Sequence, residues 1–152
     1  MNIEQNRKSL IEALRSEKYG FGRGYLRKAV NPTETSQICV WCIGGVMCEE
    51  YRLANPLTSW WEPEIEDGRE TNAYGSRSFV FFTKTDKYGR ESSVFVPTKA
   101  VLNYYGISWK ILDDLVSVND NDEGENVLEN LSEIVGILEQ TFKDHGIVEG
   151  EW

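Results

Sequence analysis

The longest apolar stretch of the chain runs from Ile38 to Leu53 and reads ICVWCIGGVMCEEYRL. It is shorter than the roughly 20 residues that span a bilayer, so it belongs in the core of a protein and not in a membrane. Its first part suits a buried strand and its second part a buried helix. Gly44 and Gly45 weaken a helix, so their presence predicts close packing against a neighbouring segment. The rest of the chain is therefore expected to fold around this stretch.

Hydrophobic spacing predicts four further helices. The last of these is the clearest, because Leu128, Leu131, Val135, Leu138 and Phe142 form one apolar stripe, and Asn126 with Glu129 fits a capping box. Gly106 suits the C-terminal end of the second one. The expected ranges are 3–15, 97–105, 108–118 and 127–142.

Extended structure is expected in fewer places. Residues 25–30 suit a short extended piece, and residues 79–82 and 93–96 suit a hairpin around a glycine-containing turn. Residues 54–78 show no period and are expected to form a long loop or insertion, and residues 143–152 a frayed tail. The sequence thus predicts a predominantly helical α+β fold with a short antiparallel hairpin or sheet, as a single domain over residues 1–152.

Charge is unevenly distributed along the chain, whose net charge is −9. Residues 111–142 hold nine acidic side chains and no Lys or Arg, whereas residues 7–28 hold seven basic and two acidic ones. A sequence pI of about 4.7 argues against free nucleic acid as the partner, because phosphate neutralisation dominates that kind of binding. The N-terminus opens polar, so no secretory signal and a cytoplasmic location are expected, without a membrane partner. A homo-oligomer stays possible.

Three cysteines lie within ten residues, at Cys39, Cys42 and Cys48. The first two have C-x-x-C spacing, but a structural zinc site needs four ligands, and the single histidine, His145, is far along the chain. We expect no metal and no cofactor here, and interpret the thiols as buried small hydrophobic groups.

Several blocks together resemble a known family. They are Leu14-Arg15-Ser16 with Tyr19, then GRGYLR at 22–27, CIGGVMC at 42–48, the segment 96–107, and LVSVND at 115–120. The chain resembles small proteins of phages and prophages that read LRSGxYxQGRGxLR, CCLGVLC, LPxxVxxWLGL and LAxLNDxGxSFxEIA. The resemblance implies a viral origin, with the host cell's cytoplasm as the location, and no particular activity. Ile43 stands where that family has a second cysteine, so no paired-cysteine chemistry is expected.

The glycine-rich loop is the first candidate binding site. Gly22 and Gly24 allow close approach of the backbone, and Arg23 and Arg27 suit phosphate. The alternative is a helix-terminating turn whose arginines pair with the acidic C-terminal helices. Aromatic side chains form the second candidate, because they stack on nucleobases. Those chosen are Trp60, Trp61 and Tyr105, with core packing as the alternative.

The acidic segment provides another candidate, a partner-binding face. Such a face would imitate the phosphates of a nucleic acid; its alternative role is solubility and neutralisation of the basic segment. Asn119–Gly124 is not a calcium loop, since Asn130 stands where a bidentate Glu is needed. The residues of the face are Asp113, Asp114, Asp120, Asp122, Glu123 and Glu125.

Three hypotheses follow. The first is a non-enzymatic virus-encoded protein that antagonises a host defence system by sequestering an anionic nucleotide-type signalling ligand. The second is an acidic protein–protein inhibitor of a host defence protein. The third is a nucleotide-processing enzyme, for which no nucleophile–base motif is present in the sequence.

Overall fold

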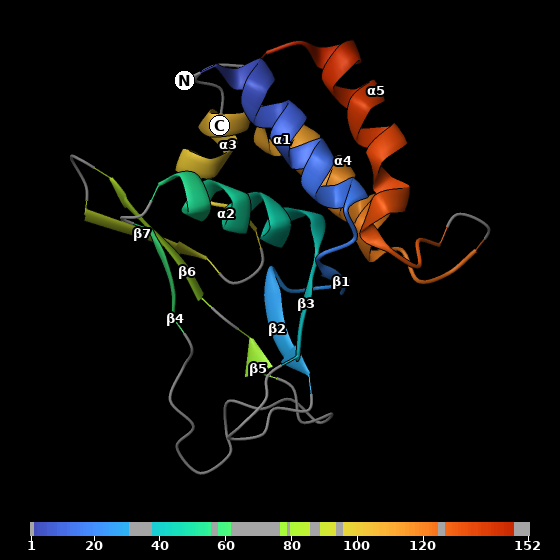
Figure 1. The fold of residues 1–152 in the computed structure, drawn as a ribbon, viewed down its shortest axis with the longest axis horizontal. Helices are drawn as coiled ribbons and strands as arrows, with labels where there is room; N and C mark the ends of the chain where they lie inside the picture. The colour runs from blue at the N-terminus through green and yellow to red at the C-terminus, as the bar shows by residue number, and fades with distance from the viewer. Residues whose placement is uncertain are drawn as a thin grey trace.

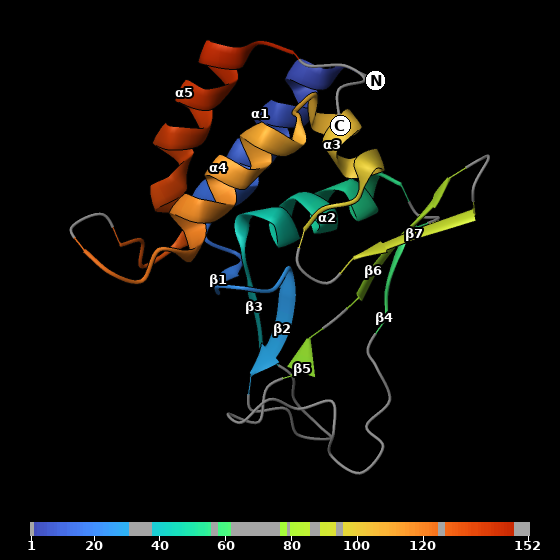
Figure 2. The ribbon, with the colours of Figure 1, turned by 180° about the vertical axis from the view of Figure 1, so that it is seen from behind.

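The computed structural model describes residues 2–30, 38–55, 58–61, 77–78, 80–85, 89–93, 96–124 and 127–147. Helices form one end of the molecule and short strands the other (Figures 1 and 2). None of the described helices is long and apolar enough to cross a membrane. The helical elements are α1 (Ile3–Arg15), α2 (Ile43–Ala54), α3 (Lys99–Tyr105), α4 (Trp109–Asp120), a 3-10 turn η1 (Leu131–Ile134) and α5 (Val135–His145).

The strands form two small sheets. In the first, the order is β1-β3-β2-β5, with β1 parallel to β3 and the other pairs antiparallel. In the second, β6 lies between β4 and β7, all antiparallel. The predicted α+β class with a helical majority and an antiparallel hairpin is therefore confirmed. The strands are β1 (Gly20–Phe21), β2 (Arg27–Val30), β3 (Ile38–Trp41), β4 (Ser59–Trp61), β5 (Arg77–Ser78), β6 (Val80–Thr85) and β7 (Gly89–Ser93).

Helix α2 lies at the centre, between the helical end and the strands (Figure 1). Its first turns, from Ile43 to Cys48, are buried, and they pack with α1, α3 and α4 into one hydrophobic core. A methyl group on Gly45 would lie 1.6 Å from the carbonyl oxygen of Leu26, and one on Gly44 would lie 2.9 Å from a ring carbon of Pro97. The close packing predicted from these two glycines is confirmed.

Local signals fix the helix ends that were predicted well. Ser108 caps α4, because its Oγ accepts a hydrogen bond from the N–H of Ile111 (3.3 Å). Gly106 ends α3 in the left-handed conformation, with φ +65°, and its neighbour Ile107 donates back to the carbonyl of Leu102.

Four expectations about element bounds were wrong. The segment expected as one long loop contains strands β4 and β5, and the hairpin's second strand is β7, four residues earlier than expected. The last helical segment begins at Leu131 and not at Val127, so Glu129 caps nothing, and Asn126 lies outside the described residues. Helix α5 then continues through His145, into the expected tail.

Candidate functional site

The glycine-rich loop is bound to its own protein. The N–H of Gly22 donates to the carbonyl of Trp41 (2.8 Å), and the N–H of Gly24, at φ +83°, donates to Asp120 Oδ1 (3.0 Å). Arg23 Nη2 donates to the carbonyl of Leu128 (2.6 Å), and its guanidinium lies 4.7 Å from the centre of the Phe21 ring. An anion would have to displace Trp41 and Asp120 to use the N–H groups of Gly22 and Gly24. Arg23 ties the loop to the C-terminal part of the chain, but through the backbone carbonyl of Leu128 and not through an acidic side chain as in the alternative interpretation.

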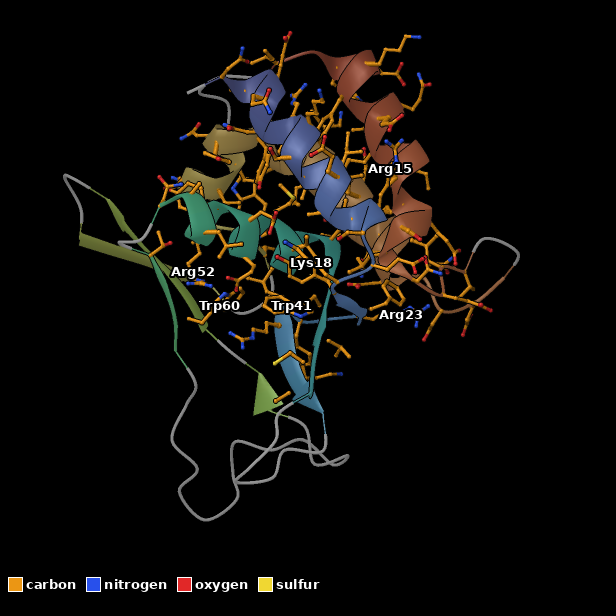
Figure 3. The ribbon with its side chains drawn as sticks, in the orientation of Figure 1. Arg15, Lys18, Arg23, Trp41, Arg52 and Trp60 are labelled. Atoms are coloured by element: carbon orange, nitrogen blue, oxygen red, sulfur yellow. The ribbon has the colours of Figure 1, made fainter. Side chains whose placement is uncertain are left out.

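Two of the predicted binding residues, Arg27 and Trp60, do come together. They line a pocket of about 510 Å³ beneath α2, a volume in the ~300–1,000 Å³ range of small-molecule sites. Figure 3 shows Trp60 and Arg52 next to each other below this helix, with Trp41 close by and Arg23 some way off, near β1. We call it the Trp41–Trp60 pocket; its described lining is Tyr19, Arg27, Trp41, Glu49, Arg52, Thr58 and Trp60.

Aromatic rings form one wall of the Trp41–Trp60 pocket. Trp41, at the end of β3, packs edge-to-face on Trp60 of β4, with ring centres 5.6 Å apart, and on Tyr19, at 5.2 Å. The guanidinium carbon of Arg27 lies 4.8 Å from the centre of Trp41 and 5.6 Å from that of Trp60. Such cation–π contacts hold the arginine head beside the rings. Arg27 Nε also contacts the sulfur of Cys39, at 3.4 Å.

A buried carboxylate lies next to Trp60 on the pocket wall. Glu49 on α2 is 7% exposed. Its Oε2 accepts the indole N–H of Trp60 (2.9 Å), and its Oε1 accepts Arg52 Nε (2.5 Å) and pairs with Arg52 Nη2. A buried carboxylate needs such partners, because its desolvation is costly. Glu49 therefore fixes both Trp60 and Arg52 at the pocket.

A second acidic side chain holds the tyrosine of the same wall. The Tyr19 hydroxyl donates to Glu50 Oε2 (2.6 Å), and Lys18 Nζ lies 3.2 Å from the same oxygen. Burial, and then this hydrogen bond, raise the pKa of Tyr19 well above its ordinary value. The phenol is therefore a neutral, fixed donor and not a general base at neutral pH.

The other predicted aromatic residues do not join the pocket. Tyr105 is 1% exposed, with its hydroxyl donating to the carbonyl of Met47 (3.4 Å), and burial raises its pKa well above the usual range. The expectation that its ring stacks on a ligand is not met, because α3 turns that ring into the core. The side chain of Trp61 lies outside the described residues; its backbone pairs with Val80 in β4 and β6.

The predicted acidic face is exposed in part. Asp113 and Asp114 on α4, and Asp122 and Glu123 after it, are exposed. Asp120 is half-buried and accepts hydrogen bonds from Gly24 and Asn119, so it holds the glycine-rich loop. Glu125 lies outside the described residues.

The cysteines contribute to packing. Burial raises the pKa of Cys42 to about 12 and that of Cys48 well above its ordinary value, whereas Cys39 is half-buried beside Arg27. In the part of the chain that the structure describes, no three His, Cys, Asp or Glu side chains are grouped to hold a metal ion.

The sequence pattern did not single out five lining residues of the pocket: Tyr19, Trp41, Glu49, Arg52 and Thr58. Trp41, Glu49 and Arg52 lie in the apolar stretch that suits a buried strand and a buried helix, which suggested packing and not binding. Only the spacing of Glu49 and Arg52, three residues apart on one helix, pointed to a pair.

Comparison with known proteins adds no identity. No protein-family model, no curated protein and no solved structure matches this chain.

Proposed function

We propose that this chain is a non-enzymatic binding protein that holds an anionic, nucleotide-type ligand in the Trp41–Trp60 pocket. The observation that carries the proposal is the meeting of two arginines and two tryptophans around one cavity of about 510 Å³. They come from β2, β3, α2 and β4, which are distant in sequence.

The two arginines supply the groups that a phosphate needs. A guanidinium binds a phosphate through two parallel N–H donors, and such charge-assisted hydrogen bonds are stronger than neutral ones. Arg52 has 38% of its side chain exposed, so it is in contact with both Glu49 and solvent. Arg27 lies on the aromatic wall, at the distances from Trp41 and Trp60 given above.

The aromatic wall supplies the surface that a nucleobase needs. A base gains roughly 1–3 kcal/mol by stacking on an aromatic ring, and every base has a face to stack. Trp60 is half-buried, and its ring orientation is fixed by the hydrogen bond to Glu49. A ring that is already fixed loses little conformational entropy on binding.

The resemblance to phage and prophage proteins suggests the biological role. A virus-encoded protein that binds a signalling nucleotide without turning it over would lower its free concentration and so antagonise a host defence system. The pocket's described lining offers charge and stacking groups, which serve retention of a ligand.

Isothermal titration with a panel of nucleotides tests this proposal. Arg27→Gln and Arg52→Gln are each expected to weaken binding by about 10- to 100-fold, the value of a charged hydrogen bond. Arg15→Gln is the matched control, since Arg15 is an exposed arginine that pairs with Glu139 and does not belong to the described lining of the pocket. The proposal fails if no nucleotide binds at millimolar concentration, or if all three variants bind as tightly as the original chain.

The exposed carboxylates of α4 and of the segment that follows it support a second candidate function, the inhibition of a basic host protein. Asp113, Asp114, Asp122 and Glu123 would steer such a partner electrostatically, and that association should weaken sharply as salt rises. Capture of a host protein that survives molar salt, or that survives replacement of these four residues by their amides, would eliminate this candidate.

A further inference from the structure

We infer that the base held in the Trp41–Trp60 pocket presents two adjacent N–H donors, as guanine does, and that Glu49 is the residue that reads them. This inference rests on the proposed function, because it names the ligand class of the same site. It starts from the Glu49 carboxylate on the pocket wall, which positions Trp60 and Arg52 and at the same time repels a purely anionic ligand.

Glu49 works against a purely anionic ligand. A carboxylate close to a bound phosphate raises the free energy of the complex by like-charge repulsion, and Glu49 also occupies Arg52, which would otherwise be available to the phosphate. A ligand that supplies only negative charge is therefore poorly matched to this pocket. A ligand that supplies negative charge together with N–H donors matches both kinds of group.

The arginine and the carboxylate can both bind one ligand if Arg52 exchanges Glu49 for the phosphate and Glu49 exchanges Arg52 for N–H donors of the base. A phosphate that binds Arg52 draws the guanidinium away from Glu49 Oε1, and the Trp60 indole remains on Oε2. A 7% exposed carboxylate that loses a charged partner must gain other donors, because a buried and unpaired charge is strongly destabilising. The ligand's own N–H groups are the donors that enter with it.

The Watson–Crick edges of the four bases differ in what they offer to a carboxylate. Guanine presents its N1–H and its exocyclic amine side by side, two donors for one carboxylate. Adenine and cytosine each place a donor next to a ring nitrogen that accepts, and uracil places one donor between two carbonyls. In the last three cases a carboxylate oxygen faces an acceptor, which a site built around a buried polar group rejects.

The contact between Trp60 and Glu49 also suits recognition of the Watson–Crick edge of the base by the carboxylate. The indole N–H binds Oε2 directly, so the carboxylate lies at the edge of the Trp60 ring. A base that stacks on an aromatic ring exposes its edge to groups beside that ring, where a carboxylate can accept from it. Stacking on Trp60 and recognition of the edge by Glu49 therefore use neighbouring parts of the same pocket.

The test compares GMP, IMP, AMP, CMP and UMP by isothermal titration against the full chain. We expect GMP to bind at least about tenfold more tightly than AMP, CMP and UMP, and IMP, which lacks the exocyclic amine, to fall between GMP and AMP. The IMP comparison needs no change to the protein, so it holds even if a variant fails to fold.

Glu49→Gln provides the protein side of the test, with Glu12→Gln, an exposed carboxylate on α1, as its control. Because Glu49 also fixes Trp60 and Arg52, Glu49→Gln is expected to affect every nucleotide, but it should weaken GMP binding about tenfold more than AMP binding. Glu12→Gln should leave both affinities unchanged. Equal binding of AMP and GMP, or an equal loss of both in Glu49→Gln, overturns the inference and leaves the proposed function standing. Binding of no nucleotide at all overturns the proposed function.

Discussion

Asn119 of α4 hydrogen-bonds two segments that are distant in the sequence, the start of α2 and the glycine-rich loop. Its side chain is fully buried, with Oδ1 accepting the N–H of Ile43 at the start of α2 (2.9 Å) and Nδ2 donating to the carbonyl of Gly22 (3.2 Å). The same amide donates to Asp120 Oδ1 (2.9 Å), which in turn holds Gly24. One amide thus satisfies the first turn of a buried helix and fixes the glycine-rich loop.

Asn119→Ala should lower the free energy of unfolding by about 2–3 kcal/mol, because it leaves the N–H of Ile43 buried without an acceptor. Asn103→Ala, the same change at an exposed position of α3, should stay within about 0.5 kcal/mol. Urea denaturation of the two variants measures the difference. Equal midpoints for the two would show that the Asn119 hydrogen bonds do not hold the fold.

The cysteines should differ in reactivity. A thiol with a pKa of about 12 is about one part in ten thousand thiolate at pH 8, and Cys42 and Cys48 are buried as well. Labelling of the native protein with a thiol reagent should therefore modify Cys39 alone, and Cys39→Ser should abolish the fast phase. All three thiols should react in denaturant; fast labelling of more than one in the native state would contradict this burial.

Among the elements, α2 depends most on close backbone packing. The backbone of Leu26 crosses α2 at Gly45 and leaves no room there for a side chain on the helix. The N–H of Cys42 also donates to the carbonyl of Leu26 (3.3 Å). The helix therefore cannot move away from β2 without losing both contacts. Glu49, about one turn further on, and Arg52, about two turns further on, are positioned for the pocket by this contact.

Gly45→Ala should destabilise the protein by about 3 kcal/mol or more, since the added methyl group would overlap the Leu26 carbonyl and backbone would have to shift. Gly136→Ala on α5 is the matched change at a helical glycine with open space around it, and it should stabilise by about 0.4–1 kcal/mol. Thermal unfolding followed by circular dichroism measures the stability of both variants. A stable Gly45→Ala variant would show that α2 and β2 are not packed as described.

The elements that sequence predicts are those with local signals. Helices α3 and α4 carry their own caps, at Gly106 and Ser108, and α2 carries its apolar run. Strands β1, β4 and β5 have two or three residues each and depend on pairing with segments far along the chain. The local sequence pattern holds no information about such pairing. The apolar stripe that begins at Leu128 fitted a helix. Leu128 instead lies in a non-helical segment, where its side chain is buried and its carbonyl accepts a hydrogen bond from Arg23.

At the scale of the molecule, the glycine-rich loop and the Trp41–Trp60 pocket are two regions, although the sequence suggested a single binding site made of both. Gly22 contacts Asn119, Gly24 contacts Asp120 and Leu26 contacts Gly45, so the glycine-rich loop is tied to α4 and α2. The Trp41–Trp60 pocket lies on the other side of β2 and β3, beneath α2 (Figure 3). Arg27 is the member of the predicted glycine-rich site that belongs to the pocket.

Two of the seven described lining residues of the candidate site were predictable for a physical reason. Arg27 and Trp60 are residue types whose chemistry suggests binding wherever they occur, so composition pointed to them. Glu49 and Arg52 gain their role only from burial against β4, a contact between segments that sequence alone does not place together.

The most direct test of the pocket is the indole region of a ¹H–¹⁵N correlation spectrum during titration with GMP to millimolar concentration. The Trp60 indole N–H, bound to Glu49, and the Trp41 indole should shift together and saturate with one dissociation constant, whereas Trp109, at the start of α4, should stay in place. The backbone amides of Gly22 and Gly24 should also stay in place, since they are bound within the protein. Unchanged Trp41 and Trp60 signals, or saturable shifts confined to Gly22 and Gly24, would contradict the account.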